Sequence, residues 1–360
     1  MSTIRCPKGL SSHIESKLLP WFRIHARKMP WRVNRSPYRV WISEAMLQQT
    51  RVETVIPYFE RWMSTFPTVK DLALSDQEAV LKCWEGLGYY ARARNLHKAA
   101  KVIVDQHGGV IPSHPEALRA LPGIGPYTQA AILSLAFDQP YAVLDGNVER
   151  VLARLCADDG DIRKSETKKR LQALATRLLA NQPPGAFNES FMELGATVCL
   201  PRNPLCEECP LHSVCRAYKQ NAVETYPVKS KKKPVPTVEV GAAITWRDEH
   251  TFLIAKRNEQ GMLGGLWEFP GGKVEAGETV EECVARELKE ELNIQVNVGE
   301  HLVRVRHTYS HFKLVMDVYH CQWAGDDPKA LDCADFRWVT RKDCDALPFS
   351  KADLKVLDVL

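Results

Sequence analysis

The sequence predicts a chain of at least two domains, an all-α domain followed by an α/β domain. At 360 residues, the chain is longer than a single hydrophobic core usually organises. Apolar residues recur at helical spacing through residues 10–220, whereas β-branched and alternating segments dominate further on. A stretch rich in proline and lysine, YPVKSKKKPVP, separates the helical pattern from the strand-like pattern. We therefore expect a first domain at 1–225, a semi-rigid basic linker at 226–236 and a second domain at 237–360.

The first domain is expected to consist of short helices, because glycine and proline punctuate it and strand-like alternation is scarce. The clearest helical periodicity lies in Val40–Gln49, Val52–Thr65, Gln77–Cys83, Arg92–Val104 and Lys168–Leu179.

The second domain is expected to contain strands around one helix. The helix is predicted at Val280–Leu292, and a final helix at the C-terminus. The predicted strands are Val238–Trp246, Thr251–Lys256, His301–His307 and Leu314–Cys321.

Composition points to a cytoplasmic protein. The N-terminus lacks the apolar run of a signal peptide, and no stretch of about 18 apolar residues predicts a membrane span. The net charge of +4 permits nucleic-acid binding without indicating it. The eleven cysteines are an odd number, which argues against a complete disulfide framework.

Four of the cysteines crowd into one short stretch with the spacing Cys-x6-Cys-x2-Cys-x5-Cys. These are Cys199, Cys206, Cys209 and Cys215. Four thiolates on one loop can bind a soft metal, and both structural zinc and a [4Fe–4S] cluster accept such a set. Zinc modules usually carry two short Cys-x2-4-Cys pairs, and this stretch has one. The spacing therefore favours the iron–sulfur cluster over zinc.

Two further segments suggest chemistry on DNA. Leu121-Pro-Gly-Ile-Gly-Pro-Tyr-Thr128 places Gly123 and Gly125 between helical segments. The turn either binds a phosphate through backbone N–H groups at a helix start or simply reverses the chain. Downstream, Asp145 either caps a helix or provides a carboxylate beside a developing positive charge. Cleavage of an N-glycosidic bond develops such a charge on the sugar.

The hairpin, the aspartate and the cysteine spacing, in this order, resemble the helix–hairpin–helix DNA glycosylases of the endonuclease III superfamily. Pro30-Trp31-Arg32, the segment 37–50 and Gly86-Leu-Gly-Tyr-Tyr-Ala-Arg-Ala-Arg94 resemble the MutY family within it. This resemblance covers almost all of 15–230. It implies a [4Fe–4S] cluster and removal of adenine mispaired with 8-oxoguanine or guanine in duplex DNA.

The resemblance also implies roles for individual residues. Glu44 matches the acid that protonates adenine, which requires burial to raise its pKa. Asp145 matches the carboxylate that stabilises the oxocarbenium ion. Tyr127 lies where strand-cleaving relatives carry a lysine, so base removal without strand cleavage is expected.

Pocket and DNA contacts follow from the same resemblance. An extruded adenine is expected to meet Arg27, Trp31 and Glu189. The linker is either a plain connector or a further phosphate-binding segment. The expected DNA contacts are Gln49, Tyr89, Gly123, Gly125 and Asn147.

The second domain resembles the Nudix fold of MutT hydrolases. His307-Thr-Tyr-Ser-His-Phe312 matches a loop that recognises 8-oxoguanine in the MutY family, which gives Tyr309, Ser310 and His311 as contacts. A nearly complete Nudix box is also present, with Asn293 in place of a glycine.

Glu287, Glu290 and Glu291 of this box fall on one helical face. Like charges so placed repel one another, and a bound Mg²⁺ or Mn²⁺ would relieve the repulsion and could hold a pyrophosphate. The box is therefore either a second active site, for nucleotides such as 8-oxo-dGTP, or a segment kept for the fold or for DNA contact.

Three functions are compatible with these features. The first is an adenine glycosylase, expected to be a nucleoid-associated monomer, whose tail reads 8-oxoguanine. The second is a Nudix pyrophosphatase that uses the helical domain for targeting, and the third is a mismatch-binding protein without catalysis. Glu44 and Asp145 favour the first, because a pure binding protein has no need of both carboxylates.

Overall fold

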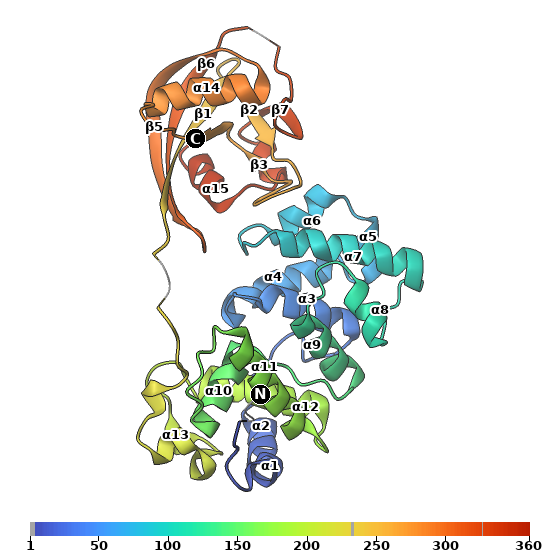
Figure 1. Cartoon of the computed structure of the whole chain (residues 1–360). Coiled ribbons are helices and arrows are strands. Elements are labelled where there is room, and N and C mark those ends of the chain that lie inside the picture. Colours follow the sequence, from blue (N-terminus) through green and yellow to red (C-terminus); the bar gives the residue numbers. More distant parts are fainter. Residues whose placement is uncertain (1–3, 232–233, 326) are drawn as a thin grey trace. The chain divides into compact units, whose positions relative to one another are not determined.

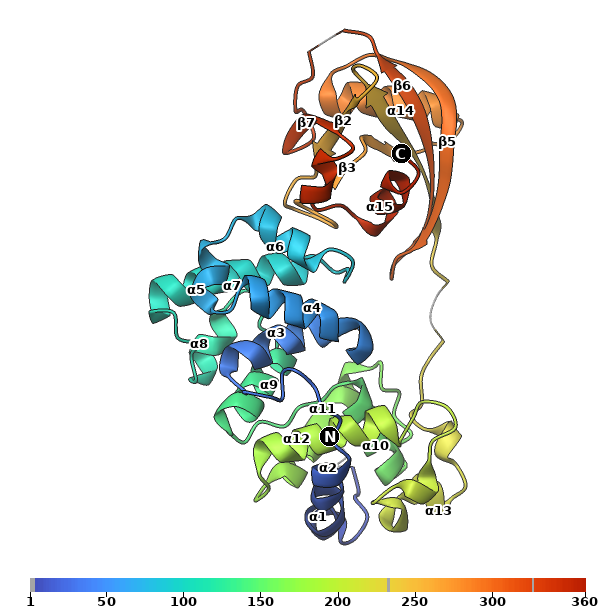
Figure 2. The ribbon, with the colours of Figure 1, turned by 180° about the vertical axis from the view of Figure 1, so that it is seen from behind.

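The computed structural model describes residues 4–231, 234–325 and 327–360. It divides into two compact units (Figures 1 and 2). Unit 1 comprises Met1–Glu60 and Val102–Lys232, and unit 2 comprises Arg61–Lys101 and Lys233–Leu360. Two lysines of the expected linker, at 232 and 233, lie outside the described residues.

Unit 1 is helical. Its core gathers apolar side chains from the N-terminal helices and from the helices that follow the hairpin, with Leu10, Ile14, Leu171 and Phe191 almost fully buried. The elements are α1 (Leu10–His13), η1 (Ile14–Leu18), α2 (Leu19–His25), α3 (Pro37–Leu47), α4 (Val52–Thr65, shared with unit 2), α8 (Pro115–Ala120), α9 (Pro126–Phe137), α10 (Gly146–Cys156), α11 (Ser165–Leu179), α12 (Pro184–Thr197) and α13 (Arg216–Lys219), with short 3-10 turns at η2 (Cys206–Glu208), η3 (His212–Val214) and η4 (Val223–Thr225).

Unit 2 contains one mixed sheet, which has seven strands within the described residues. The main order is β3-β2-β1-β6-β5, with β4 on β1 and β7 on β2, and β1 runs parallel to β6. The strands are β1 (Thr237–Trp246), β2 (Thr251–Lys256), β3 (Trp267–Glu268), β4 (Gly271–Lys273), β5 (Val296–Thr308), β6 (Lys313–Trp323) and β7 (Asp335–Thr340), followed by the 3-10 turn η5 (Asp343–Ala346).

One helix covers each face of this sheet (Figures 1 and 2). α14 (Val280–Leu292) packs on the face that presents Ala243, whereas α15 (Lys351–Leu357) packs on the face that presents Ala242 and Ile244. This alternation follows from the two-residue period of a strand. The predicted fold class, a helical domain followed by an α/β Nudix-fold domain, is confirmed.

The helices α5 (Val69–Leu74), α6 (Gln77–Trp84) and α7 (Ala91–His107) group largely with unit 2, whereas the sequence assigned them to 1–225. Polar contacts join these helices to later parts of unit 2. Arg94 donates to the carbonyl of Gly264 at 2.7 Å, and Lys256 pairs with Glu78 at 2.6 Å. Contacts of this kind join residues far apart in the sequence, so no local sequence pattern predicts them. None of the described helices is both long and apolar enough to cross a bilayer.

Candidate active site and cysteine loop

A cavity of about 810 Å³ in unit 1 collects most of the residues predicted for the site. They come from seven places in the chain: the segment before α3, α3 itself, the turn between α3 and α4, the hairpin before α9, the start of α9, the start of α10, and α12. The predicted residues that line it are Arg27, Trp31, Glu44, Gln49, Gly123, Gly125, Tyr127, Asp145, Asn147 and Glu189.

Glu44 projects from α3 into this cavity and is only 4% exposed. The Ser36 hydroxyl caps the helix by accepting from the Arg39 amide, and Pro37 occupies its first turn, so the start of α3 is fixed. The Tyr127 hydroxyl donates to Glu44 Oε2 at 2.6 Å. Burial raises the pKa of Glu44 to about 7; the nearby Asp145 and Glu189 add to this and the Tyr127 hydrogen bond opposes it. Glu44 can therefore carry a proton near neutral pH.

Asp145 is the N-cap of α10 and also lines the cavity. The two predicted roles, a helix cap and a carboxylate of the site, are therefore compatible. One carboxylate oxygen accepts from the Val148 amide at 2.7 Å, and the other accepts from Asn147 Nδ2 at 2.9 Å. Burial raises the pKa of Asp145, and these hydrogen bonds oppose the rise by stabilising the ionised form. The carboxylate is held in place by its own helix.

Contacts continue from Asp145 to the cysteine loop. Arg150 Nη2 donates to Asn147 Oδ1 at 2.8 Å, and Arg150 Nε donates to the Cys199 carbonyl at 2.8 Å. One helical turn later, Arg154 Nη1 lies 3.3 Å from Cys199 Sγ. α10 thus joins the cavity to the loop through side chains of one helix face.

The cysteine loop holds all four predicted ligands around one small cavity. Cys199, Cys206, Cys209 and Cys215 all line it. Yet within 4–231, 234–325 and 327–360, no three His, Cys, Asp or Glu side chains are arranged to hold a metal ion. One zinc ion would need every sulfur about 2.3 Å from a single point. A [4Fe–4S] cluster bonds each of four cysteines to a different iron, and the four thiols around this cavity provide such a set.

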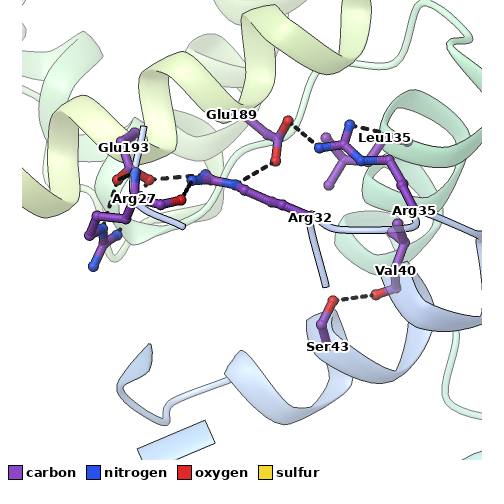
Figure 3. A network of polar contacts seen from close by, with 8 residues as sticks. All are labelled: Arg27, Arg32, Arg35, Val40, Ser43, Leu135, Glu189 and Glu193. Atoms are coloured by element: carbon purple, nitrogen blue, oxygen red, sulfur yellow. Dashed lines mark hydrogen bonds and ion pairs between the residues drawn. The ribbon is translucent and has the colours of Figure 1, made fainter. Parts of the chain in front are cut away.

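A chain of arginines and glutamates borders the cavity (Figure 3). Arg32 Nε donates to Glu189 Oε1 at 2.9 Å, and Arg35 Nη2 donates to Glu189 Oε2 at 2.7 Å. Glu193, one turn after Glu189 on α12, binds Arg27 and Arg32. Sequence reasoning missed Arg32, Arg35 and Glu193. The sequence offered a signal for them: three arginines fall within nine residues, and two glutamates lie four residues apart in a later helix.

The turns at the cavity use special backbone conformations. Gly123 has a φ of 75°, which suits glycine, and Gly125 is the N-cap of α9. Gln49, between α3 and α4, has a φ of 61°. All three residues line the cavity.

In unit 2, two predicted contact residues meet. Tyr89 is 39% exposed with a φ of 50°, and Arg92 stacks over its ring at 5.5 Å. The hydroxyls of Tyr89 and Ser310 form a short hydrogen bond. His311 is exposed. Tyr309 instead packs inward, its ring 5.0 Å from that of Phe312.

The Nudix-box glutamates Glu287, Glu290 and Glu291 lie on α14, where an arginine pairs with two of them. Arg286 binds Glu278 at 2.7 Å and both Glu287 and Glu290 at 3.0 Å, so its single positive charge offsets part of the charge of these three carboxylates. Burial raises the pKa of Glu291 to about 8, and the charges of nearby glutamates add to the rise. Among the described residues, no group of three His, Cys, Asp or Glu side chains that could hold a metal ion is found, and this includes Glu287, Glu290 and Glu291.

The helix α14 ends where the sequence predicted, at Leu292. Asn293 has a φ of 56° and caps α14, as expected for an asparagine in a glycine position.

Comparison with known proteins places the chain among base-excision enzymes. Residues 42–177 match the model of the HhH-GPD superfamily of base excision DNA repair proteins, 199–215 match the iron–sulfur binding domain of endonuclease III, and 241–359 match the NUDIX domain. The adenine DNA glycosylase of Rattus norvegicus is 36% identical over 95% of this chain and 77% of that protein. The adenine DNA glycosylase of Buchnera aphidicola (subsp. Acyrthosiphon pisum) is 37% identical over 85% of each. The structure of a thermostable thymine-DNA glycosylase covers 59% of this chain and 96% of its own, with a TM-score of 0.51 and 28% identity.

Proposed function

This chain belongs to the adenine DNA glycosylase family, and we propose that it hydrolyses the N-glycosidic bond of adenine mispaired with 8-oxoguanine or guanine in duplex DNA. The observation that carries the proposal is the pair of buried carboxylates in one cavity. Glu44 is able to hold a proton near pH 7, whereas Asp145 accepts hydrogen bonds that favour its ionised form. Two carboxyl groups with different environments can divide acid and electrostatic roles.

In this mechanism Glu44 donates its proton to the adenine ring and so makes the base a better leaving group. Positive charge then develops on the sugar, and Asp145 stabilises it from a fixed position. A water molecule adds to the anomeric carbon and releases a proton, which completes the hydrolysis. Tyr127 orients the Glu44 carboxyl through its hydrogen bond. A phenol cannot form an imine with the sugar, so we expect no strand cleavage by that route.

The adenine would leave the duplex and enter the cavity. Arg27, Trp31 and Glu189 would line its pocket. The turns at the cavity would contact the DNA backbone through Gly123, Gly125 and Asn147. Gln49 and Tyr89 would enter the duplex beside the mispair.

The second domain would read the partner base. Ser310 and His311 are the exposed members of the predicted recognition loop. Tyr309 packs under the loop, so its share in recognition would be to support the other two. We propose that Ser310 contacts 8-oxoguanine and that the Tyr89 hydroxyl positions it.

The iron–sulfur group is proposed to be [4Fe–4S], held by Cys199, Cys206, Cys209 and Cys215. When bound, it would stabilise the fold of the loop. Arg154 would donate a hydrogen bond to the Cys199 sulfur, and Arg150 would tie the loop to α10. We expect a monomer that associates with the nucleoid.

A second candidate activity is hydrolysis of 8-oxo-dGTP-like nucleotides with Mg²⁺ or Mn²⁺ at Glu287, Glu290 and Glu291. The match to the NUDIX domain supports it. The ion pairs of Arg286 and the burial of Glu291 weigh against it, so we derive no step through the metal. Incubation of the full chain with 8-oxo-dGTP and Mg²⁺ tests it, with pyrophosphate release as the readout.

The glycosylase proposal is tested on a labelled duplex that carries one A·8-oxoguanine pair. We expect free adenine and a strand break only after alkali treatment. Intact adenine would refute the proposal. A break without alkali would refute the assignment of an enzyme without strand cleavage.

A further inference from the structure

Glu193 is the least exposed member of the charged chain that borders the cavity, and the proposed mechanism gives it no role (Figure 3). Its side chain is 1% exposed. The chain alternates in sign, in the order Arg27, Glu193, Arg32, Glu189 and Arg35.

Both oxygens of Glu193 are occupied. Oε1 accepts from the Arg27 amide at 3.0 Å and from Arg27 Nε at 2.7 Å, while Oε2 accepts from Arg32 Nη2 at 3.0 Å. Burial works against ionisation, but the bonds from Arg27 and the charge of Arg32 prevail and lower the pKa of Glu193. A buried carboxylate bound by two guanidinium groups is a rigid anchor.

This anchor closes a short turn that carries a pocket residue. Arg32 also donates from Nη1 to the Arg27 carbonyl at 2.9 Å, and its amide donates to the Met29 carbonyl at 3.0 Å. Trp31 lies within the turn, 6% exposed, with its ring 5.4 Å from that of Phe59 in an edge-on contact. The positions of Arg27 and Trp31 therefore depend on Glu193.

We infer that Glu193 is a positioning residue of the adenine pocket, which fixes Arg27 and Arg32 and thereby the wall that Trp31 and Glu189 present to the base. The inference rests on the proposed function. It assigns to Glu193 no contact with the adenine itself.

The charged chain also bears on Glu44 through Arg32 and Glu189. Three arginines and two glutamates leave the chain with one net positive charge, and loss of the Glu193 charge would leave two. Arg32 lowers the pKa of Glu44 and Glu189 raises it, so Glu44 responds to this chain. The charged and titratable groups that share the cavity with Glu44 are Tyr127 of α9, Asp145 at the start of α10, Glu189 and Glu193 of α12, Arg27, Arg32 and Arg35 of the segment before α3, and Arg51 and Glu53 around the start of α4.

The test uses the full chain, with Glu193→Gln and Glu193→Asp compared with wild type. Single-turnover adenine release from an A·8-oxoguanine duplex is measured against protein concentration and against pH. Glu193→Gln loses both the charge and the anchor. We expect the protein concentration that gives half-maximal release to rise about tenfold. The alkaline limb of the pH–rate profile, where the rate falls as pH rises, should move to lower pH by roughly half a unit.

Glu193→Asp keeps the charge on a shorter side chain. We expect a half-saturating concentration raised about threefold, with the alkaline limb at the wild-type pH. Glu116→Gln, which removes an exposed carboxylate on α8, serves as the matched charge control and should change neither quantity.

The outcomes separate the claims. Absence of adenine release by wild type overturns the proposed function and this inference with it. An active wild type with unchanged saturation in both Glu193 variants overturns the inference alone. A fall in melting temperature with an unshifted alkaline limb in Glu193→Gln would make Glu193 merely structural, which also overturns it. If Glu193→Gln does not fold, the saturation of Glu193→Asp decides.

Discussion

The carboxylates of the unit 1 cavity and those of the Nudix box in unit 2 differ in what surrounds them. Glu44 accepts a hydrogen bond from a neutral phenol, and burial leaves it able to hold a proton. Glu278, Glu287 and Glu290 are bound by a single arginine, and its hydrogen bonds lower the pKa of Glu278 to about 2. Glu278 is thus a fixed anion, whereas Glu291 of the same box, with a pKa that burial raises to about 8, resembles Glu44. The surroundings of each carboxyl group, and not the presence of glutamates, indicate which of them can act as an acid.

The largest expected effect comes from Asp145→Asn, which keeps the shape of the cap and removes the charge. We expect single-turnover adenine release to fall about 10³-fold. Glu149→Gln on the same helix is the matched control and should cost no more than a few-fold. Equal activity of Asp145→Asn and wild type would show that the cavity does not depend on its anionic carboxylate.

Glu44→Gln should have the next largest effect. An amide cannot deliver the proton, and removal of a general acid typically costs about 10²-fold or more. Duplex binding, measured by fluorescence anisotropy, should stay within a few-fold of wild type. A rate loss explained wholly by weaker binding would contradict the role of Glu44 as an acid.

The variant Tyr127→Phe tests the environment of Glu44 through the pH dependence of adenine release. The Tyr127 hydroxyl stabilises the ionised form of Glu44, so its removal should raise the pKa of Glu44 further. Because protonated Glu44 is the active form, the alkaline limb should move to higher pH, by roughly half a unit. A limb that moves to lower pH would mean that the hydroxyl favours the protonated carboxyl.

The smallest effect is expected in unit 2. Arg286→Met removes the cation that holds three glutamates, and we expect the affinity of the full chain for Mn²⁺ to rise several-fold from a weak value. Electron paramagnetic resonance of free Mn²⁺ measures this. Adenine release should be unchanged. Tight Mn²⁺ binding by the unaltered chain would instead favour the second candidate activity.

The sequence predicted elements best where local signals suffice. The bounds of α4 and α14 agree with the prediction because their apolar periodicity is strong, and a capping box between Thr279 and Glu282 fixes the start of α14. The strands β3, β4 and β7 were missed. Two or three residues, as in β3 and β4, are too few for a periodicity. The pairing of Glu193 with Arg27 joins residues 166 positions apart, so only the folded chain brings it about.

Site residues were found by motif and not by spacing alone. Glu44, Tyr127 and Asp145 were each named from the sequence, and they line one cavity. The neutralisation of the Nudix glutamates could have been anticipated less easily. Arg286 belongs to the same motif, but one of its three partners, Glu278, lies in the loop before α14, and only the folded chain brings the two together.

The most direct test is the pH dependence of single-turnover adenine release by the wild-type chain and by Glu44→Gln. Burial raises the pKa of Glu44 to about 7, so the active protonated form is present below that pH and is lost as pH rises through it. The wild-type rate should therefore fall about tenfold for each pH unit above 7, and the residual rate of Glu44→Gln should lack this limb. A wild-type rate that stays level between pH 7 and 9, or the same limb in Glu44→Gln, would contradict the assignment of Glu44 as the acid.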